Sequence, residues 1–293
     1  MARKIKVKRT ALGRVKKHLR LLGVALALWA GSYGYEVTIA RPPLLYQGAP
    51  QAVSGADWRT WFRILRNDGF VVGYSDLRGN PLWVMYALTP LPPKVPHLKR
   101  PNRFETDWRS LNRIDHDDYA RSGYDRGHNA PNYAMSRLNG RAGQADSFLM
   151  TNISPQKPNF NQKFWQRLEE VEISFFAPNF GKVWVITGPI FGAHSQRLST
   201  SWRVEVPTAF YKIYVTEPTP TRPMAALAFV VPQTVKGKEP LTQFVTRIKD
   251  VEAQTGLNFL VDLDDKTETD LEGTIDVASW QLNAVNKTLP RYR

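Results

Sequence analysis

The 293-residue chain contains no cysteine. This absence excludes disulfide bridges, thiolate-bound zinc sites and cysteine nucleophiles, but it leaves the compartment open. No internal repeat is present either. Hydrophobic residues make up 42% and aromatic residues 12% of the chain, which is enough for a packed core and excludes a disordered protein. The length suits one large α+β domain with an N-terminal appendage.

Acidic residues are missing from the first twenty positions, which carry nine Lys or Arg residues. The rest of the chain has 31 basic against 26 acidic residues, so most of the formal net charge of +14 belongs to the N-terminus. A basic excess is often the footprint of nucleic-acid binding. Because the remaining domain is only mildly basic, net charge alone gives that interpretation little support.

A long hydrophobic run is also missing near the N-terminus, where the apolar run Leu21–Ala30 is short. Spanning a bilayer takes about 20 largely apolar residues. The basic segment, the short apolar run and the small residues Ala30 and Ser32 indicate a secretory signal cleaved after Ser32, or a retained anchor extended by residues 33–39. We expect residues 1–35 to be a signal peptide or signal anchor, and the remainder to be exported: secreted, periplasmic or membrane-anchored facing away from the cytoplasm. A DNA-binding basic tail is the alternative.

Proline, glycine and apolar periodicity divide the remainder into elements. The Pro-containing stretch Ala40–Gln51 predicts a linker within residues 36–56, ahead of a folded domain at residues 57–293. Helices are predicted at Asp57–Asp68 and at Leu241–Thr255, the second ended by Gly256. Strands are predicted at Phe70–Ser75, Pro81–Leu88, Val183–Phe191, Ala209–Val215 and Met224–Val231. Since strands outnumber helices and do not alternate with them regularly, we expect an α+β fold with a central antiparallel sheet and flanking helices.

The tetrapeptide Asp125-Arg126-Gly127-His128 combines several groups that suit phosphodiester chemistry. The imidazole of His128 titrates near neutral pH and can take a proton from water. Gly127 lets the backbone turn tightly and approach a substrate, and Arg126 can hold a phosphate. The other histidines, at positions 18, 97, 116 and 194, have no comparable neighbours. We therefore expect His128 to be a general base, with a structural histidine as the alternative.

A second polar set lies downstream in Asn161–Glu169, a run that predicts a helix with Phe164 and Leu168 facing the core. Positions eight apart lie within about 80° of each other around a helix, so Asn161 and Glu169 share one side. An amide oxygen and a carboxylate suit Mg²⁺, which prefers oxygen ligands and keeps several waters. The alternatives are a helix cap at Asn161, a solvated Glu169 and a turn residue at Asn152.

The segment Tyr124-Asp-Arg-Gly-His-Asn-Ala-Pro131 resembles the DNA/RNA non-specific endonuclease family, as do Thr151-Asn-Ile-Ser-Pro-Gln-Lys157 and Asn161–Glu169. This is the ββα-metal group with a DRGH motif, which includes secreted bacterial nucleases and mitochondrial endonuclease G. Segments such as Asn80-Pro-Leu-Trp-Val84 and Val183-Trp-Val-Ile-Thr-Gly-Pro189 extend the resemblance over roughly residues 57–265. It implies the ββα-metal nuclease fold.

The resemblance also implies an activity: metal-dependent, sequence-non-specific hydrolysis of DNA and RNA to products with 5′-phosphate ends. His128 would be the general base that deprotonates the attacking water. Asn161 would be the direct protein ligand of a hydrated Mg²⁺, for which Mn²⁺ is a substitute. Glu169 would orient metal-bound water, Asn152 would support the site, and Arg126 belongs to the catalytic motif.

Arg100 matches the family's phosphate-binding arginine, and Arg103 is a second candidate for that contact. At Ile173 the sequence departs from the family, whose members often carry an arginine one helical turn after the glutamate. A phosphate contact is therefore missing or comes from elsewhere, for example from Arg137, Arg141 or Lys163.

Three other functions remain open on the sequence alone. One is a catalytically weak nucleic-acid-binding member of the same fold, and another is a metal phosphoesterase for small substrates. The third is a membrane-anchored scaffold, which would explain residues 1–35 but not the central motifs. DNA and RNA are the expected partners. Homodimers and an inhibitor protein occur among relatives, although no residue here indicates either.

Overall fold

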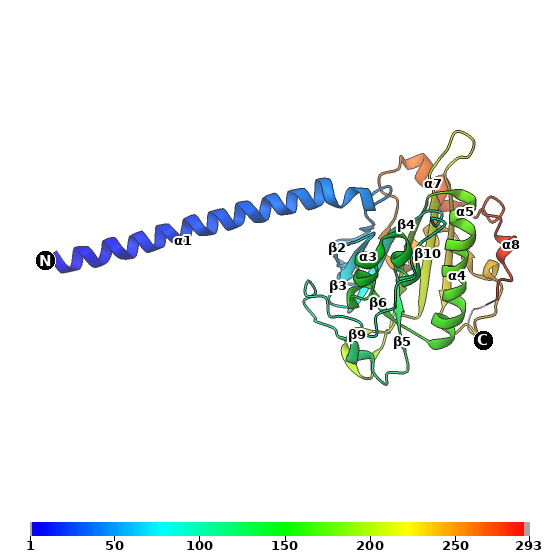
Figure 1. Ribbon diagram of the computed structural model, residues 1–293, viewed down its shortest axis with the longest axis horizontal. Coiled ribbons are helices and arrows are strands. Elements are labelled where there is room, and N and C mark those ends of the chain that lie inside the picture. Colours follow the sequence, from blue (N-terminus) through cyan, green and yellow to red (C-terminus); the bar gives the residue numbers. More distant parts are fainter. Residues whose placement is uncertain (1, 290–293) are drawn as a thin grey trace. The chain divides into compact units, whose positions relative to one another are not determined.

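The computed structural model describes residues 2–289, with side chains described from residue 13 onward (Figure 1). The chain divides into two compact units, residues 1–43 and residues 44–293. The first unit contains helix α1 (Ala2–Tyr35) and the π-helical segment η1 (Glu36–Ala40). Among the described residues, no helix combines the length and the apolarity that crossing a membrane requires.

The second unit is built on a seven-stranded antiparallel sheet, which confirms the expected α+β fold. Its strands, in spatial order, are β12 (Val245–Thr246), β11 (Ala225–Pro232), β10 (Ala209–Thr216), β7 (Val183–Ile190), β4 (Asn80–Leu88), β3 (Phe70–Ser75) and β2 (Arg63–Asn67). All five predicted strands are present, each within one residue of its predicted start and end. Short pairs accompany the sheet: β1 (Gln51–Ala52) with β13 (Leu257–Asn258), and β8 (Arg197–Leu198) with β9 (Ser201–Glu205).

Both faces of the sheet are buried, because alternate side chains of each strand enter two different hydrophobic cores. On β3, Phe70 and Val72 belong to one core and Val71 to the other. The second face is covered by α6 (Ile248–Thr255) and α7 (Asp265–Gly273), with residues 44–49 packed against the same core. Strands with no exposed face explain why their sequences read as near-continuous apolar runs.

The first face is covered by a long helix in four segments: η6 (Phe160–Trp165), α4 (Gln166–Val171), η7 (Glu172–Phe176) and α5 (Ala177–Phe180). Segments η6 and η7 are π-helical. Phe164 and Leu168 are fully buried, which confirms that they face the core. In Figure 1 this helix runs beside strand β10, and ring contacts such as Phe160–Phe210 at 5.0 Å join the two.

A buried arginine ties this helix to the C-terminal part of the chain. The side chain of Arg167 is 1% exposed. Its Nη1 donates to the carbonyl oxygens of Gly237 (3.1 Å) and Glu239 (2.8 Å), and its Nη2 donates to that of Asn286 (3.2 Å). Asn286 directly follows helix α8 (Leu282–Val285), so this segment is anchored on the long helix.

A smaller ββα unit stands beside the sheet and carries the central motif. Strand β5 (Asp125–His128) pairs with β6 (Ile153–Gln156), and the long helix follows β6. Between the two strands lie α2 (Asn132–Leu138), α3 (Gly140–Ser147) and the 3₁₀ turn η5 (Met150–Asn152).

Two predicted helices need correction. Asp57–Asp68 is not a helix: its first part is the 3₁₀ turn η3 (Trp58–Thr60), capped by the Asp57 side chain, and its second part is strand β2. Pairing of Arg63–Asn67 with β3 outweighs the local helical periodicity. Leu241–Thr255 is helical only at its two ends, η8 (Leu241–Phe244) and α6, because Val245–Thr246 pairs with β11 between them. Gly256 ends α6 with φ +70°, as predicted.

The predicted linker, residues 36–56, contains ordered structure. The 3₁₀ turn η2 (Pro42–Leu44) is followed by Tyr46, which stacks on Trp184 of the sheet at 5.3 Å. Strand β1 then pairs with β13. A further 3₁₀ turn, η4 (His116–Tyr119), precedes strand β5.

Candidate active site

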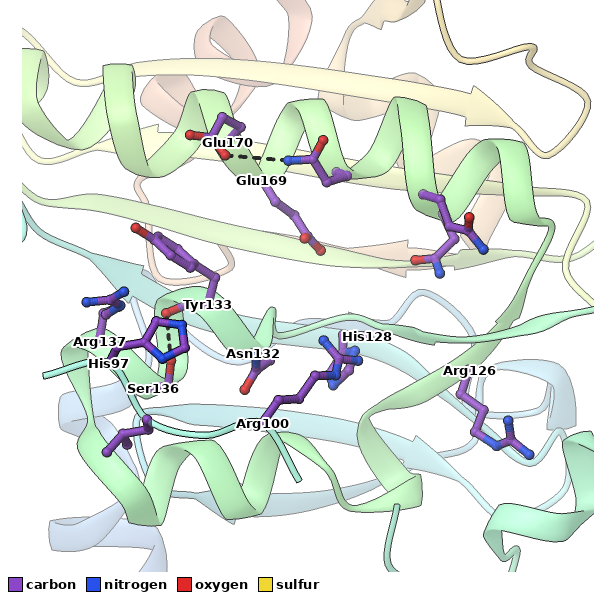
Figure 2. A pocket seen from close by; sticks show the side chains of 14 residues that line it. His97, Arg100, Arg126, His128, Asn132, Tyr133, Ser136, Arg137, Glu169 and Glu170 are labelled. Atoms are coloured by element: carbon purple, nitrogen blue, oxygen red, sulfur yellow. Dashed lines mark hydrogen bonds between the residues drawn. The ribbon is translucent and has the colours of Figure 1, made fainter. Parts of the chain in front are cut away.

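A pocket of about 550 Å³ opens between strand β5, helix α2 and the long helix. Figure 2 shows its lining side chains. They come from loop 97–100, strand β5, helix α2 and segments η6 and α4: His97, Leu98, Arg100, Arg126, His128, Asn132, Tyr133, Ser136, Arg137, Asn161, Gln162, Gln166, Glu169 and Glu170. Five of the seven predicted site residues therefore line one cavity.

The pairing of β5 with β6 explains why glycine precedes the histidine. Gly127 lies opposite Ser154 in the register, and a Cβ at Gly127 would collide with the side chain of Gln156. A larger residue would therefore have to displace the buried side chain of Gln156 next to His128.

Asn152 is fully buried and lies outside the pocket lining. Its Nδ2 donates to the carbonyl oxygens of Ala130 and Ser147, both at 2.9 Å, and its Oδ1 accepts from the backbone N–H of Ala130 at 2.8 Å. The side chain thus holds the backbone two residues after His128.

The imidazole of His128 packs against two phenylalanine rings, with ring centres 5.2 Å away for Phe104 and 5.0 Å away for Phe148. Burial lowers the pKa of His128 to about 3, and the positive charge of Arg100 adds to this effect. The imidazole is therefore uncharged at neutral pH and can accept a proton. Its Nε2 is buried and has no hydrogen-bond partner among the described residues. A buried polar atom without a hydrogen-bond partner in a pocket indicates that a ligand or a water molecule binds to it.

Asn161 is oriented by the first residue of the DRGH motif. Its Nδ2 donates to Asp125 Oδ2 at 2.9 Å, and Gln162 Nε2 donates to the same oxygen at 2.8 Å. Since the amide nitrogen is engaged by the carboxylate, the amide oxygen is directed away from it and is available as a ligand. The sequence indicated Asn161 but not its positioning by Asp125.

The donor set of the pocket fits Mg²⁺. Within residues 2–289 no group of three or more His, Cys, Asp and Glu side chains could hold a metal ion. An ion here would therefore have few protein ligands, and Mg²⁺ commonly keeps several of its waters and takes one or two protein oxygens. The amide oxygen of Asn161 and the carboxylate of Glu169 are such groups, and in Figure 2 Glu169 points from α4 into the pocket, toward the side that carries His128.

Arg126 and Arg100 both bring positive charge to the pocket that His128 lines (Figure 2). Arg126 donates from Nε and Nη2 to the carbonyl oxygen of His116 at 3.0 and 2.7 Å, which fixes its guanidinium. Burial is the main reason why the pKa of Arg126 is lowered, and it stays cationic because an arginine starts from 12.5. Arg100 stacks on Phe148 with its Cζ 5.1 Å from the ring centre.

The second arginine of the basic loop is placed differently. Arg103 lies outside the pocket lining and donates to Asp117 at 2.8 Å in an exposed ion pair. Of the proposed substitutes for the family arginine, Arg137 lines the pocket, whereas Arg141 lines a neighbouring groove that shares Arg100. Ile173, which stands where relatives carry that arginine, is buried in the core.

A family model described as DNA/RNA non-specific endonuclease matches residues 60–266, which include the complete pocket. The chain belongs to the DNA/RNA non-specific endonuclease family. It is 31% identical to a nuclease from Syncephalastrum racemosum over 229 residues, covering 71% of this chain and 70% of that protein. It is 37% identical to nuclease C1 from Cunninghamella echinulata var. echinulata over 164 residues, covering 53% of this chain and 64% of that protein.

The fold agrees with this family. A chain from a crystal structure of the EndoG/EndoGI complex superimposes with a TM-score of 0.60 and 26% identity, covering 69% of this chain and 87% of that chain. The chain therefore has the fold of the EndoG ββα-metal nucleases and the enzyme class of DNA/RNA endonucleases. Its match to the two fungal nucleases spans about two thirds of their length.

Proposed function

We propose that the protein is a metal-dependent, sequence-non-specific endonuclease that hydrolyses DNA and RNA to products with 5′-phosphate ends. The observation that carries this proposal is the meeting of an uncharged His128, whose Nε2 lacks a partner among the described residues, with Asn161 and Glu169 in one pocket. Contacts to phosphate carry no base information, so a site built from arginines, an amide and a carboxylate suits a non-specific nuclease.

Each side chain has a defined task in this proposal. His128 takes a proton from the attacking water, and the negative phosphate beside it raises the pKa of the imidazole toward the useful range. Asn161 would hold Mg²⁺ or Mn²⁺ through its amide oxygen, and Glu169 would orient water beside it. The bound ion supplies charge neutralisation on the scissile phosphate and assists the leaving 3′ oxygen. Arg126, held by His116, and Arg100 contact phosphate oxygens.

The test uses the full-length protein with plasmid DNA and with RNA, each in Mg²⁺ and in EDTA. We expect both polymers to be cut in Mg²⁺ only, and His128→Ala and Asn161→Ala to lose at least about 100-fold in rate. His194→Ala and Asn179→Ala are matched controls, since both side chains are exposed and lie outside the pocket. Intact polymers with the wild type would reject the proposal, and binding without cleavage would indicate the weak nucleic-acid-binding alternative.

We also propose that residues 1–35 direct export. The support is the sequence itself: a basic segment without acids, followed by the apolar run Leu21–Ala30. Fractionation with mass spectrometry should find a chain starting near Tyr33 outside the cytosol, or the intact chain in membranes. Detection in the cytosol alone would contradict export.

A further inference from the structure

The pocket continues beyond the groups that the proposed chemistry uses. In Figure 2, Arg126 lies toward one end, His128 and Arg100 lie in the middle, and Tyr133, His97 and Arg137 lie toward the other end. Tyr133 and Arg137 both belong to α2, one turn apart, so they project from the same side of that helix. A polymer lying along this pocket with one phosphate at His128 would have its next unit beside α2.

Tyr133 offers a flat apolar surface there. Its side chain is 38% exposed, although its neighbours Ala134 and Met135 on the same helix are buried. The guanidinium of Arg137 lies 5.1 Å from the centre of the Tyr133 ring. Arg137 is in turn fixed, since its Nη1 donates to the carbonyl oxygen of Val95 at 2.9 Å. Arg137 therefore restricts the motion of the Tyr133 ring, and this lowers the entropy lost when a second planar group stacks on the ring.

The side chains at this end of the pocket suit the binding of one nucleotide. A nucleobase is the planar group of a nucleic acid, and base–aromatic stacking tolerates every base because each has a π-face. Arg137 has N–H groups beyond the one bound to Val95. A base on Tyr133 and a phosphate at Arg137 thus correspond to one nucleotide unit.

We propose that Tyr133 stacks on the base next to the scissile phosphate, and that Arg137 contacts the following phosphate. Bases inside a duplex are stacked on both faces, so this contact requires a locally unpaired strand. The inference rests on the proposed nuclease function and adds a substrate contact to it: an unpaired strand of RNA or DNA gains the stacking on Tyr133, whereas a paired base in a duplex does not.

The test combines a change in the protein with a change in the substrate. End-labelled single-stranded 12-mers carry one abasic position, moved along the strand, and the cutting rate at each bond is resolved on a gel for the full-length wild type and Tyr133→Leu. At one fixed offset from the cut bond, base removal should slow the wild type about tenfold and slow Tyr133→Leu less than twofold. Tyr133→Phe should behave as the wild type, because stacking uses the ring and not the hydroxyl. On duplex DNA, Tyr133→Leu should lose less rate than it loses on the intact single strand.

Trp202→Leu is the matched control, since Trp202 is 80% exposed and lies outside the pocket lining. It should show the wild-type response to every abasic position. The inference is overturned if abasic positions slow Tyr133→Leu as much as the wild type, or if Tyr133→Phe loses as much rate as Tyr133→Leu. Melting temperatures within about 2 °C of the wild type exclude misfolding of the variants.

Failure of the nuclease proposal would be recognised separately. If the wild type leaves every strand uncut, its binding to a single strand containing 2-aminopurine is measured in EDTA. Quenching of 2-aminopurine fluorescence by the wild type and Tyr133→Phe, but not by Tyr133→Leu, would still support stacking on Tyr133. Equal quenching by all three proteins would overturn it.

Discussion

His128 packs against two aromatic rings, and its burial there keeps the imidazole uncharged. Because the pKa is lowered to about 3 in the folded protein from an ordinary 6.5, the unfolded chain binds the proton first as the pH falls. The stability that this group contributes is therefore complete above pH 6.5 and is lost as the pH falls toward 3. We expect a loss of about 2 kcal/mol between pH 7 and pH 5 through His128.

Urea unfolding at the two pH values measures this effect. His128→Leu removes the titrating group, so its loss of stability between pH 7 and pH 5 should be smaller than that of the wild type by the same amount. An identical pH dependence in the two proteins would show that the imidazole is not held in its neutral form.

Asn152 should matter for stability although it lies outside the pocket. Asn152→Ala removes three buried hydrogen bonds to Ala130 and Ser147, so we expect a loss of ~3 kcal/mol in the free energy of unfolding. Nuclease activity should also fall, because Ala130 follows His128 by two residues. Asn179→Ala, which removes a single exposed hydrogen bond to Phe175, should cost under ~0.5 kcal/mol. Equal losses would contradict the bracing role of Asn152.

Residues of the candidate site could be predicted from the sequence where the prediction depends on residues nearby in the chain. His128, Arg126, Asn161 and Glu169 all line the pocket as expected. Tyr133 could not be identified, since its exposure depends on which face of α2 meets the core. The engagement of Arg103 by Asp117 also follows from folding, because the two are brought together by the turn η4.

At the scale of elements, the long helix is fastened to the sheet by a buried ionic cluster. Lys212 of β10 donates to Glu172 at 3.0 Å, and both side chains are 0% exposed. The hydroxyls of Tyr86 and Tyr214 donate to the same carboxylate, each at 3.1 Å, and the Lys212 ammonium lies 4.7 Å from the ring centre of Trp165. Because Glu172 follows Glu169 by three residues, this cluster fixes the part of the helix that serves the pocket.

Removing one partner of the cluster should be costly. Lys212→Met leaves the Glu172 charge buried without its cation, so we expect a loss of about 3–5 kcal/mol in chemical denaturation. The double variant Lys212→Met/Glu172→Leu should recover most of that loss. Lys182→Met breaks the half-exposed Lys182–Glu217 pair and should cost less than ~1 kcal/mol. Additive losses in the double variant would show that the two groups do not stabilise each other.

Helix α7 carries a carboxyl group, that of Glu272, whose contribution to stability depends on pH in the opposite direction to that of His128. Burial beside Glu252 and Glu268 raises the pKa of Glu272 to about 8. Its neutral form is therefore favoured by folding: the stabilisation is complete below pH 4.5 and is lost as the pH rises toward 8. We expect Glu272→Gln to be more stable than the wild type at pH 8, by at least about 1 kcal/mol, and to lose that advantage at pH 5. Asp270→Asn, at an exposed position, should change little at either pH.

The elements that could be predicted are those with strong local signals. The central strands were predicted closely, because they are buried on both faces and rich in apolar residues. The helix expected at Asp57–Asp68 was wrong, since β2 exists only through its pairing with β3. The π-helical geometry of η6 could not be predicted either, although Asn161 and Glu169 still line one pocket.

At the scale of the whole molecule, the second unit contains its own core, and that core begins at Leu44. Deletion of residues 1–43 should leave the melting temperature unchanged within about 2 °C. Deletion of residues 1–56 should lower it by several degrees, because Tyr46 and strand β1 are lost from the second face of the sheet. Differential scanning calorimetry of both proteins distinguishes an inert linker from an integral part of the domain. Equal melting temperatures would identify residues 44–56 as dispensable.

Arg167 gives the C-terminal segment a part in the active centre without any contact to substrate. Carbonyls of residues 237, 239 and 286 share one guanidinium beneath the pocket-lining helix. We therefore expect substitutions in these distant loops to shift the backbone that presents Asn161 and Glu169. Substitutions in that segment during evolution would therefore change the rate of catalysis, and so would an engineered truncation before Asn286. Both lie outside the motifs by which this family is identified.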